Sequence, residues 1–258
     1  VPHDVETYDI KNIDEIFPSR HYIPFRLEQD LSDTDHSFKE DRYIIDENFE
    51  DKLINIMIDN IKPDVPLRYT NILDGVQNVT TKVGYDRSYN KKSQSFSVRA
   101  LNDFPHEVER YSLSYKISSC TKNPDESRVI GIGDTFTQNL QTCVRDQMSL
   151  LFCNKHDMYG KDRWVFERKL QIEEGKTFIQ IDQSKSGWSF PTRLIGLAFT
   201  ALHKVYPDYE YFSILQEIFI NKRIFLSIND ELKQIQKGFC LGMWDNVMSF
   251  VLSCMFSL

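Results

Sequence analysis

A carboxylate in the last third of the chain, Asp182, stands where it could hold a metal ion. A run of β-branched and aromatic residues precedes it and predicts a short strand over 177–181. Small and polar residues follow, so the strand ends in a tight turn. Such a position suits a divalent cation, because the strand fixes the carboxylate oxygen and the turn leaves room for a ligand. Alternatively, Asp182 caps a helix that is predicted to begin near Pro191.

Two glycines and three polar residues near the end of the sequence form a second group that could contact a ligand. Gly238 and Gly242 predict a flexible backbone loop. Asp245, Asn246 and Ser249 follow on the first turns of a helix whose apolar part is 250–256. Helix capping explains one of these polar residues, but three of them beside a glycine loop favour a binding role.

Two β-hairpins are predicted to position these groups. Residues 111–119 alternate between apolar and polar, a turn follows at 123–126, and 128–132 returns as a second strand. The second hairpin comprises 223–228 and 232–236, and it leads into the glycine loop. The first hairpin is basic, because it carries Lys116, Lys122 and Arg128.

Helices fill the remaining patterned segments. Apolar residues recur at helical spacing over 47–61, 136–152, 191–205 and 211–219. Gly133-Asp134-Thr135 ends the preceding strand and caps the second of these helices. The alternation of hairpins and helices predicts an α+β protein.

Composition and charge restrict the class of protein. With 258 residues, 41% of them hydrophobic, the chain can bury a large core as one domain or two lobes. The net charge of −7 argues against a protein that coats nucleic acid with its whole surface, but not against a local basic channel. The five cysteines include no Cys-x-x-Cys pair, which favours reduced core residues in an intracellular protein and no zinc site. No apolar run reaches the roughly 18 residues that span a membrane, so no membrane segment is expected.

The N-terminal part of the sequence differs in character. Residues 1–41 are acidic and irregular, which predicts an extended arm or linker. Between 69 and 99, aromatic residues are mixed with basic ones that include Lys91, Lys92 and Arg99. Such a stretch could follow a single strand of nucleic acid, with cations on phosphates and rings on bases, but it also fits a solvated loop. The chain does not begin with Met, so we expect a fragment or a processed product.

Three of these elements, in this order, resemble conserved blocks of viral RNA-dependent RNA polymerases. The end of the basic hairpin and its exit, 127–138, resemble the fingers block called motif F, most of all the version in mitovirus and narnavirus relatives. Residues 182–188, Asp-Gln-Ser-Lys-Ser-Gly-Trp, resemble motif A, although the Lys and Trp are similar to those of negative-strand polymerases. Residues 238–249 resemble motif B through a Gly-Met-aromatic core. The resemblance covers 111–258.

This resemblance implies a role for each charged residue of the first two blocks. Asp182 would be the catalytic carboxylate and would bind Mg²⁺ or Mn²⁺, since nucleotidyl transfer uses two cations with hard oxygen ligands. Arg128 and Lys122 would face the triphosphate of the incoming nucleotide. Lys185 would touch a phosphate, or it is a simple surface lysine.

The resemblance also implies contacts with the sugar and with the template. A group that recognises the 2′-hydroxyl of the nucleotide would come from Asp245, Asn246 or Ser249. Template contacts would come from the glycine loop and the basic stretch, that is, from Gly238, Gly242, Lys91, Lys92 and Arg99. The expected partners are therefore an RNA template and product and nucleoside triphosphates.

The sequence departs from the family pattern at two points. Gly187 occupies the position where motif A of positive-strand polymerases has a second Asp. Motif C, the hairpin with a further metal-binding carboxylate, is missing, because no Gly-Asp-Asp or Ser-Asp-Asp occurs. We expect either a fragment cut after motif B or a divided polymerase whose companion polypeptide supplies motif C, as in narnavirus-like viruses of fungi. The implied location is the host cytoplasm, or the mitochondrion for a mitovirus-like enzyme.

The fold implied by the resemblance is the fingers plus a partial palm of a right-hand polymerase. Residues 1–110 would form an N-terminal arm and fingers, 111–176 the fingers with the basic hairpin, and 177–258 the partial palm. The palm would be an antiparallel sheet with packed helices, whose open edge and last helix would need a partner. Two alternatives are a non-catalytic RNA-binding or scaffold protein of a viral replication complex, and an unrelated cytosolic α+β domain that binds no RNA.

The missing motif C generates a first prediction. The purified chain alone, given a primed RNA template, nucleotides and Mg²⁺, is expected to make no extended product, because the second metal-binding carboxylate is not in the sequence. A primer-extension assay measures this directly. Extension above the background of a nucleotide-free control would contradict the prediction.

Overall fold

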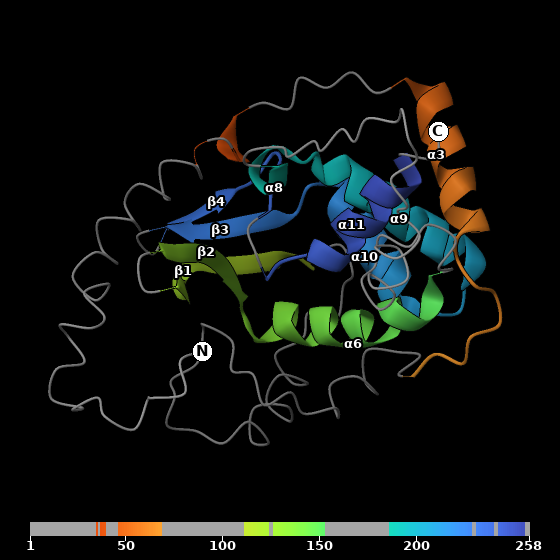
Figure 1. The fold of residues 1–258 in the computed structure, drawn as a ribbon, viewed down its shortest axis with the longest axis horizontal. Coiled ribbons are helices and arrows are strands. Elements are labelled where there is room, and N and C mark those ends of the chain that lie inside the picture. Colours follow the sequence, from red (N-terminus) through yellow and green to blue (C-terminus); the bar gives the residue numbers. More distant parts are fainter. Residues whose placement is uncertain are drawn as a thin grey trace, which may run out of the picture.

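The computed structural model describes residues 35, 37–39, 46–68, 111–123, 126–152, 186–228, 231–239 and 242–255. They form an α+β fold in which a four-stranded sheet lies to one side of a group of packed helices (Figure 1). The α+β class expected from the sequence is confirmed at this level.

Both predicted hairpins are present. β1 (Leu113–Asn123) pairs antiparallel with β2 (Glu126–Gly133), and β3 (Ile224–Ile228) pairs antiparallel with β4 (Glu231–Gln234). The sheet has the order β2-β1-β3-β4, and β1 pairs with β3 in parallel. The expectation of an antiparallel sheet is therefore wrong, because the described sheet is mixed. Local alternation of apolar residues predicts each hairpin, but it carries no information on how two distant hairpins join.

The parallel central pair orients both hairpins alike. Since β1 and β3 run in the same direction, the ends of these two strands and the starts of β2 and β4 lie at one end of the sheet, away from the helices (Figure 1). The returning strands β2 and β4 then bring the chain back to the helices at the other end. The sequence blocks that follow the two hairpins therefore begin at the same end of the sheet.

The helices also match the predicted segments. α3 (Glu47–Asp59) and α6 (Thr135–Leu151) are both capped by an aspartate, and the Asp134 carboxylate accepts the backbone N–H of Thr137 at 2.7 Å, as predicted. A short helix, α8 (Ser186–Ser189), precedes α9 (Thr192–Val205) and α10 (Glu210–Ile220). The last described helix is α11 (Asp245–Met255). Asp245, Asn246 and Ser249 therefore lie on its first turns, as predicted.

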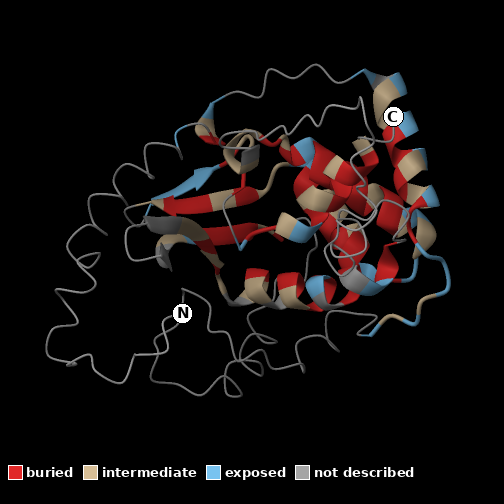
Figure 2. Ribbon diagram, in the orientation of Figure 1, coloured by how far each residue is buried: buried red, intermediate tan, exposed pale blue. Residues whose placement is uncertain are grey.

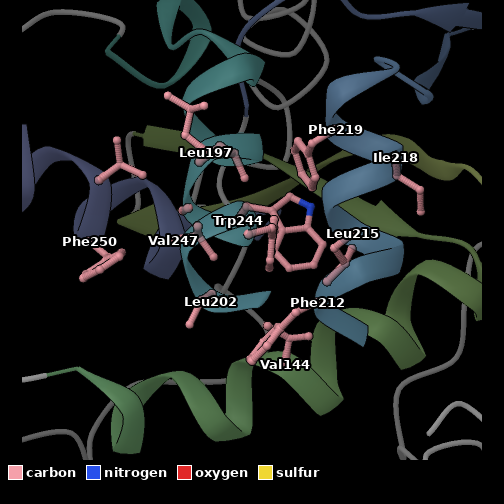
Figure 3. Close-up of a cluster of buried hydrophobic side chains, with 14 of the residues drawn as sticks. Val144, Leu197, Leu202, Phe212, Leu215, Ile218, Phe219, Trp244, Val247 and Phe250 are labelled. Atoms are coloured by element: carbon pink, nitrogen blue, oxygen red, sulfur yellow. The ribbon is translucent and has the colours of Figure 1, made fainter. Parts of the chain in front are cut away.

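One hydrophobic cluster joins the helices to the inner ends of the strands (Figure 2). α9 supplies its centre, and Phe199 of this helix packs 5.4 Å from Phe219 of α10 and 5.4 Å from Trp244, measured between ring centroids. Figure 3 shows Trp244 surrounded by side chains of α6, α9, α10 and α11. Members of the cluster lie on both sides of the expected boundary between 176 and 177.

One face of the last helix is covered within the chain. α11 buries one face against α9, α3 and α6, and Phe250 stacks on Phe152 with 3.8 Å between ring centroids. Other apolar residues of this helix, Met248, Leu252 and Met255, are only half-buried, so the expectation that it needs a partner stays a prediction. Two cysteines of the described core, Cys143 and Cys254, are reduced, as predicted. Among the described helices, none has the length and apolar character needed to cross a membrane.

The central position of Phe199 generates a prediction for stability. Phe199→Ala is expected to lower the free energy of unfolding by about 3–5 kcal/mol, because it removes a fully buried ring that contacts three other rings. Leu150→Ala is the matched control on α6, since Leu150 is 49% exposed and its loss should change stability by less than about 0.5 kcal/mol. Urea denaturation measures both. Equal losses in the two variants would show that the core is not centred on α9.

Candidate functional site

The exits of the two hairpins meet at Gly242. A methyl group added to Gly242 would lie 3.3 Å from the carbonyl oxygen of Gly131 in β2. β2 and β4 are the opposite edges of the sheet, so the chain leaves one edge after Gln234 and reaches the other edge by Gly242. The block that resembles motif B therefore lies directly against the block that resembles motif F.

The block that resembles motif A contacts the same segment from another side. The backbone N–H of Gly238 donates to the carbonyl of Phe190 at 2.7 Å, and the N–H of Phe239 donates to the carbonyl of Gly187 at 2.7 Å. An isolated bridge between Pro191 and Lys237 continues this pairing. Residues 187–191, at the end of the motif A resemblance, thus form a short paired segment with 237–239.

The two glycines in this pairing are required by close backbone contact. A methyl group on Gly238 would lie 2.2 Å from the carbonyl oxygen of Trp188, and one on Gly187 would lie 2.6 Å from that of Phe239. Gly238 also has φ of +84°, which residues with a side chain rarely adopt. Gly238 is buried, whereas Gly242, with φ of +88°, is exposed. Of the two glycines, Gly242 is therefore the one that another molecule could reach.

Side chains from two helices hold the backbone of Gly242. Its N–H donates to the Asp245 carboxylate at 2.9 Å, and its carbonyl accepts from the Gln141 side-chain amide at 3.2 Å. The same amide of Gln141 also donates to the carbonyl of Met243. We did not identify Gln141 from the sequence. In the sequence, the only feature that could have indicated a role for Gln141 is that a polar residue follows Leu140 on the core-facing side of an amphipathic helix.

The three polar residues at the start of α11 differ in environment. Burial raises the pKa of the Asp245 carboxyl, and the hydrogen bond from Gly242 opposes this rise. The Ser249 hydroxyl donates to the backbone carbonyl of Asp245 at 2.8 Å. Asn246 is exposed. Asp245 and Ser249 therefore make local bonds within the loop and helix, as the capping alternative expects of one such residue.

For the basic residues Lys122 and Arg128 of the first hairpin, the structure describes the position of the backbone. Arg128 pairs with Cys120, and Lys122 lies in the irregular stretch between Thr121 and Asn123, close to the hairpin turn. Arg128 precedes Gly131 by three residues on β2, a separation of about 10 Å along a strand. Both residues thus belong to the strand pair that leads to Gly242, and their side chains are outside the described atoms.

The remaining predicted residues lie outside the described part of the chain. These are Asp182, Lys185, Lys91, Lys92 and Arg99. Within the described ranges, no group of three or more His, Cys, Asp or Glu residues could hold a metal ion. The expectation of Mg²⁺ or Mn²⁺ rests on Asp182, four residues before α8 in the sequence.

A scan of the sequence against protein-family models found no match, and a search of curated proteins found none either. Function is therefore inferred from the residues and from their arrangement.

The two loop glycines allow a comparison of variants. Gly238→Ala is expected to lower the free energy of unfolding by at least about 3 kcal/mol, because the methyl group meets the Trp188 backbone and φ is positive. Gly242→Ala should cost only about 1–2 kcal/mol, because its φ is positive but its nearest neighbour is 3.3 Å away. Urea denaturation of both variants tests the order. A Gly238 variant as stable as the Gly242 variant would exclude the close backbone contact.

Proposed function

We propose that this chain is part of a viral RNA-dependent RNA polymerase, the part that holds the incoming nucleotide and the template. The catalytic hairpin with a further carboxylate would come from a companion polypeptide or from another part of the same protein. One observation carries this proposal: three blocks that are far apart in the sequence, around Gly131, Gly187 and Gly242, converge on a single loop.

Convergence of these blocks supports the proposal because of what nucleotidyl transfer requires. The triphosphate, the metal ions and the sugar of one nucleotide lie within a few ångströms of one another, so residues that serve them must gather at one place. Gly242 contacts Gly131 of the motif F resemblance, and the segment 237–239 pairs with the end of the motif A resemblance. An unrelated α+β domain gives no reason for these three segments in particular to meet.

The residues then take the following roles. Asp182 would be one ligand of Mg²⁺ or Mn²⁺, and such cations would supply activation of a 3′-hydroxyl and stabilisation of the charge on pyrophosphate. Lys122 and Arg128 attract the triphosphate, with Lys185 as a further phosphate contact. Asn246, exposed beside the glycine loop, is the best-placed group for the 2′-hydroxyl.

The other residues of the resemblance to motif B shape the loop. Asp245 is bonded to Gly242 and Ser249 is bonded to Asp245, so both stabilise the loop and the start of α11. Gly238 fixes the loop against Trp188, and Gly242 is the glycine that meets the template. Lys91, Lys92 and Arg99 extend the template contacts as cations on the RNA backbone.

Asp182→Asn tests this function in the assembled complex. The complex is purified through an affinity tag on this chain from cells that carry its encoding RNA, and RNA-directed incorporation of labelled nucleotide is measured with Mg²⁺. The substitution should lower incorporation by at least about 100-fold, since a metal ligand supplies several kcal/mol of charge stabilisation. RNA affinity, measured by fluorescence anisotropy, should not change.

The control is Asp51→Asn, which alters an exposed carboxylate on α3. This variant should keep both incorporation and RNA affinity. If Asp182→Asn leaves incorporation intact, the chain is a non-catalytic RNA-binding or scaffold protein. If the wild-type chain binds no RNA, both of these functions are excluded and an unrelated domain remains.

A further inference from the structure

Gln141 connects the helix that follows the basic hairpin to the glycine loop. It lies on α6, seven residues after the Asp134 cap, and only 8% of it is exposed. Its amide nitrogen donates to the carbonyls of both Gly242 and Met243, which are about a hundred positions later in the sequence. A single buried side chain therefore fixes the orientation of two consecutive peptide groups.

Gly242 is held from both directions. The Asp245 carboxylate of α11 accepts its N–H, and Gln141 of α6 binds its carbonyl. The neighbouring residues are fixed more firmly, because Met243 and Trp244 are buried in the core and Gly238 is fixed against Trp188. Gly242 is thus an exposed residue next to the buried Met243 and Trp244, and the side chains of Asp245 and Gln141 bond its N–H and its carbonyl.

The path from the basic hairpin to this turn is short and made of packed elements. β2 ends at Gly133, where an added methyl group would lie 2.8 Å from the Thr137 side chain. The Thr137 hydroxyl accepts the backbone N–H of Ser114 in β1 at 3.0 Å, so the first turn of α6 is fixed to the hairpin. Gln141 lies one helical turn after Thr137 and hydrogen-bonds to the glycine loop. The position of the loop is therefore linked to that of the hairpin.

We propose that Gln141 is a positioning residue, which orients the Gly242 turn for contact with RNA by coupling it to the basic hairpin through α6. This inference rests on the proposed function, because it assumes that the loop meets RNA. It adds a residue outside the three blocks that carry the family resemblance to motifs F, A and B. A purely structural role would require only that the buried space be filled.

Two substitutions distinguish a residue that positions the loop from one that only fills buried space. Gln141→Met keeps most of the volume and removes both hydrogen bonds. Gln141→Glu keeps the shape and makes donation dependent on pH: a neutral carboxyl can donate one hydrogen bond, whereas a carboxylate repels the two carbonyl oxygens. Burial raises the pKa of such a carboxyl, so its donor is present at low pH and is lost as pH rises through that pKa.

The matched control is the same substitution at a second buried glutamine of the same helix, Gln147→Met. The Gln147 side-chain oxygen accepts the backbone N–H of Arg68 at 3.3 Å, and Arg68 follows α3 in the sequence. This variant therefore also removes a side-chain hydrogen bond from the buried face of α6, but one that does not hold the glycine loop. A difference between the two methionine variants isolates the bonds to Gly242 and Met243.

Hydrogen exchange and RNA binding are measured on the full chain. We expect Gln141→Met to exchange the backbone amides of 242–245 about tenfold faster than wild type, because two carbonyls lose their donor. We expect its affinity for a labelled single-stranded RNA to fall about tenfold as well. Gln141→Glu should match Gln141→Met at pH 7.5 and recover toward wild type at pH 5, with wild type compared at each pH. Gln147→Met should behave as wild type in both measurements.

Each result has one meaning. Unchanged exchange in Gln141→Met overturns the coupling, and so does faster exchange with unchanged RNA affinity. If Gln147→Met changes exchange and affinity as much as Gln141→Met does, the cause is a general loosening of α6, and the proposed coupling is overturned as well. Absence of recovery in Gln141→Glu at pH 5 shows that a hydrogen-bond donor at this position does not restore the loop, and it also overturns the proposal. If the wild-type chain does not bind RNA, the proposed function fails first and the inference fails with it. Circular dichroism confirms that each variant is folded before it is scored.

Discussion

β1 and β3 are hydrogen-bonded in parallel, with Leu113 opposite Ile224 and Lys116 opposite Ser227, and most of the arrangement depends on this pairing. Parallel strands cannot be joined by a tight turn, so the chain between them must make a long crossover. In this protein the crossover contains α6, α8, α9 and α10, which provide much of the core. The same pairing sends both hairpin exits to the helical end of the sheet, which is where the candidate site forms.

At that end, the site is built mainly from backbone. Gly187 and Gly238 let two chain segments approach more closely than side chains would allow, and their N–H and carbonyl groups satisfy one another. Gly242 then presents a peptide group whose orientation is set by side chains from two helices. The described part of this segment therefore combines a fixed backbone at 237–239 with an exposed glycine at 242, an arrangement that fits the proposed contact with RNA.

Sequence patterns predicted the parts of the fold that depend on neighbours in the chain. The hairpins, the helices and the cap at Asp134 follow from periodicity and from local hydrogen bonding, and each is present. The parallel β1–β3 pair was not predicted, because its partners are distant and no periodic signal links them. Gln141 was missed for the same reason, since a glutamine on a buried face has meaning only once its partner is known. Gly238 was expected to give flexibility, whereas its close contact with Trp188 shows that it is needed for space.

The long crossover also has a consequence for how the protein is made. During synthesis, β1 leaves the ribosome roughly 110 residues before β3, which corresponds to a delay on the order of ten seconds. For that time the β1 edge that β3 will occupy has no strand to pair with. The nascent chain therefore passes through a period in which a sheet edge is available to other molecules, and the arrival of Ile224–Ile228 closes it.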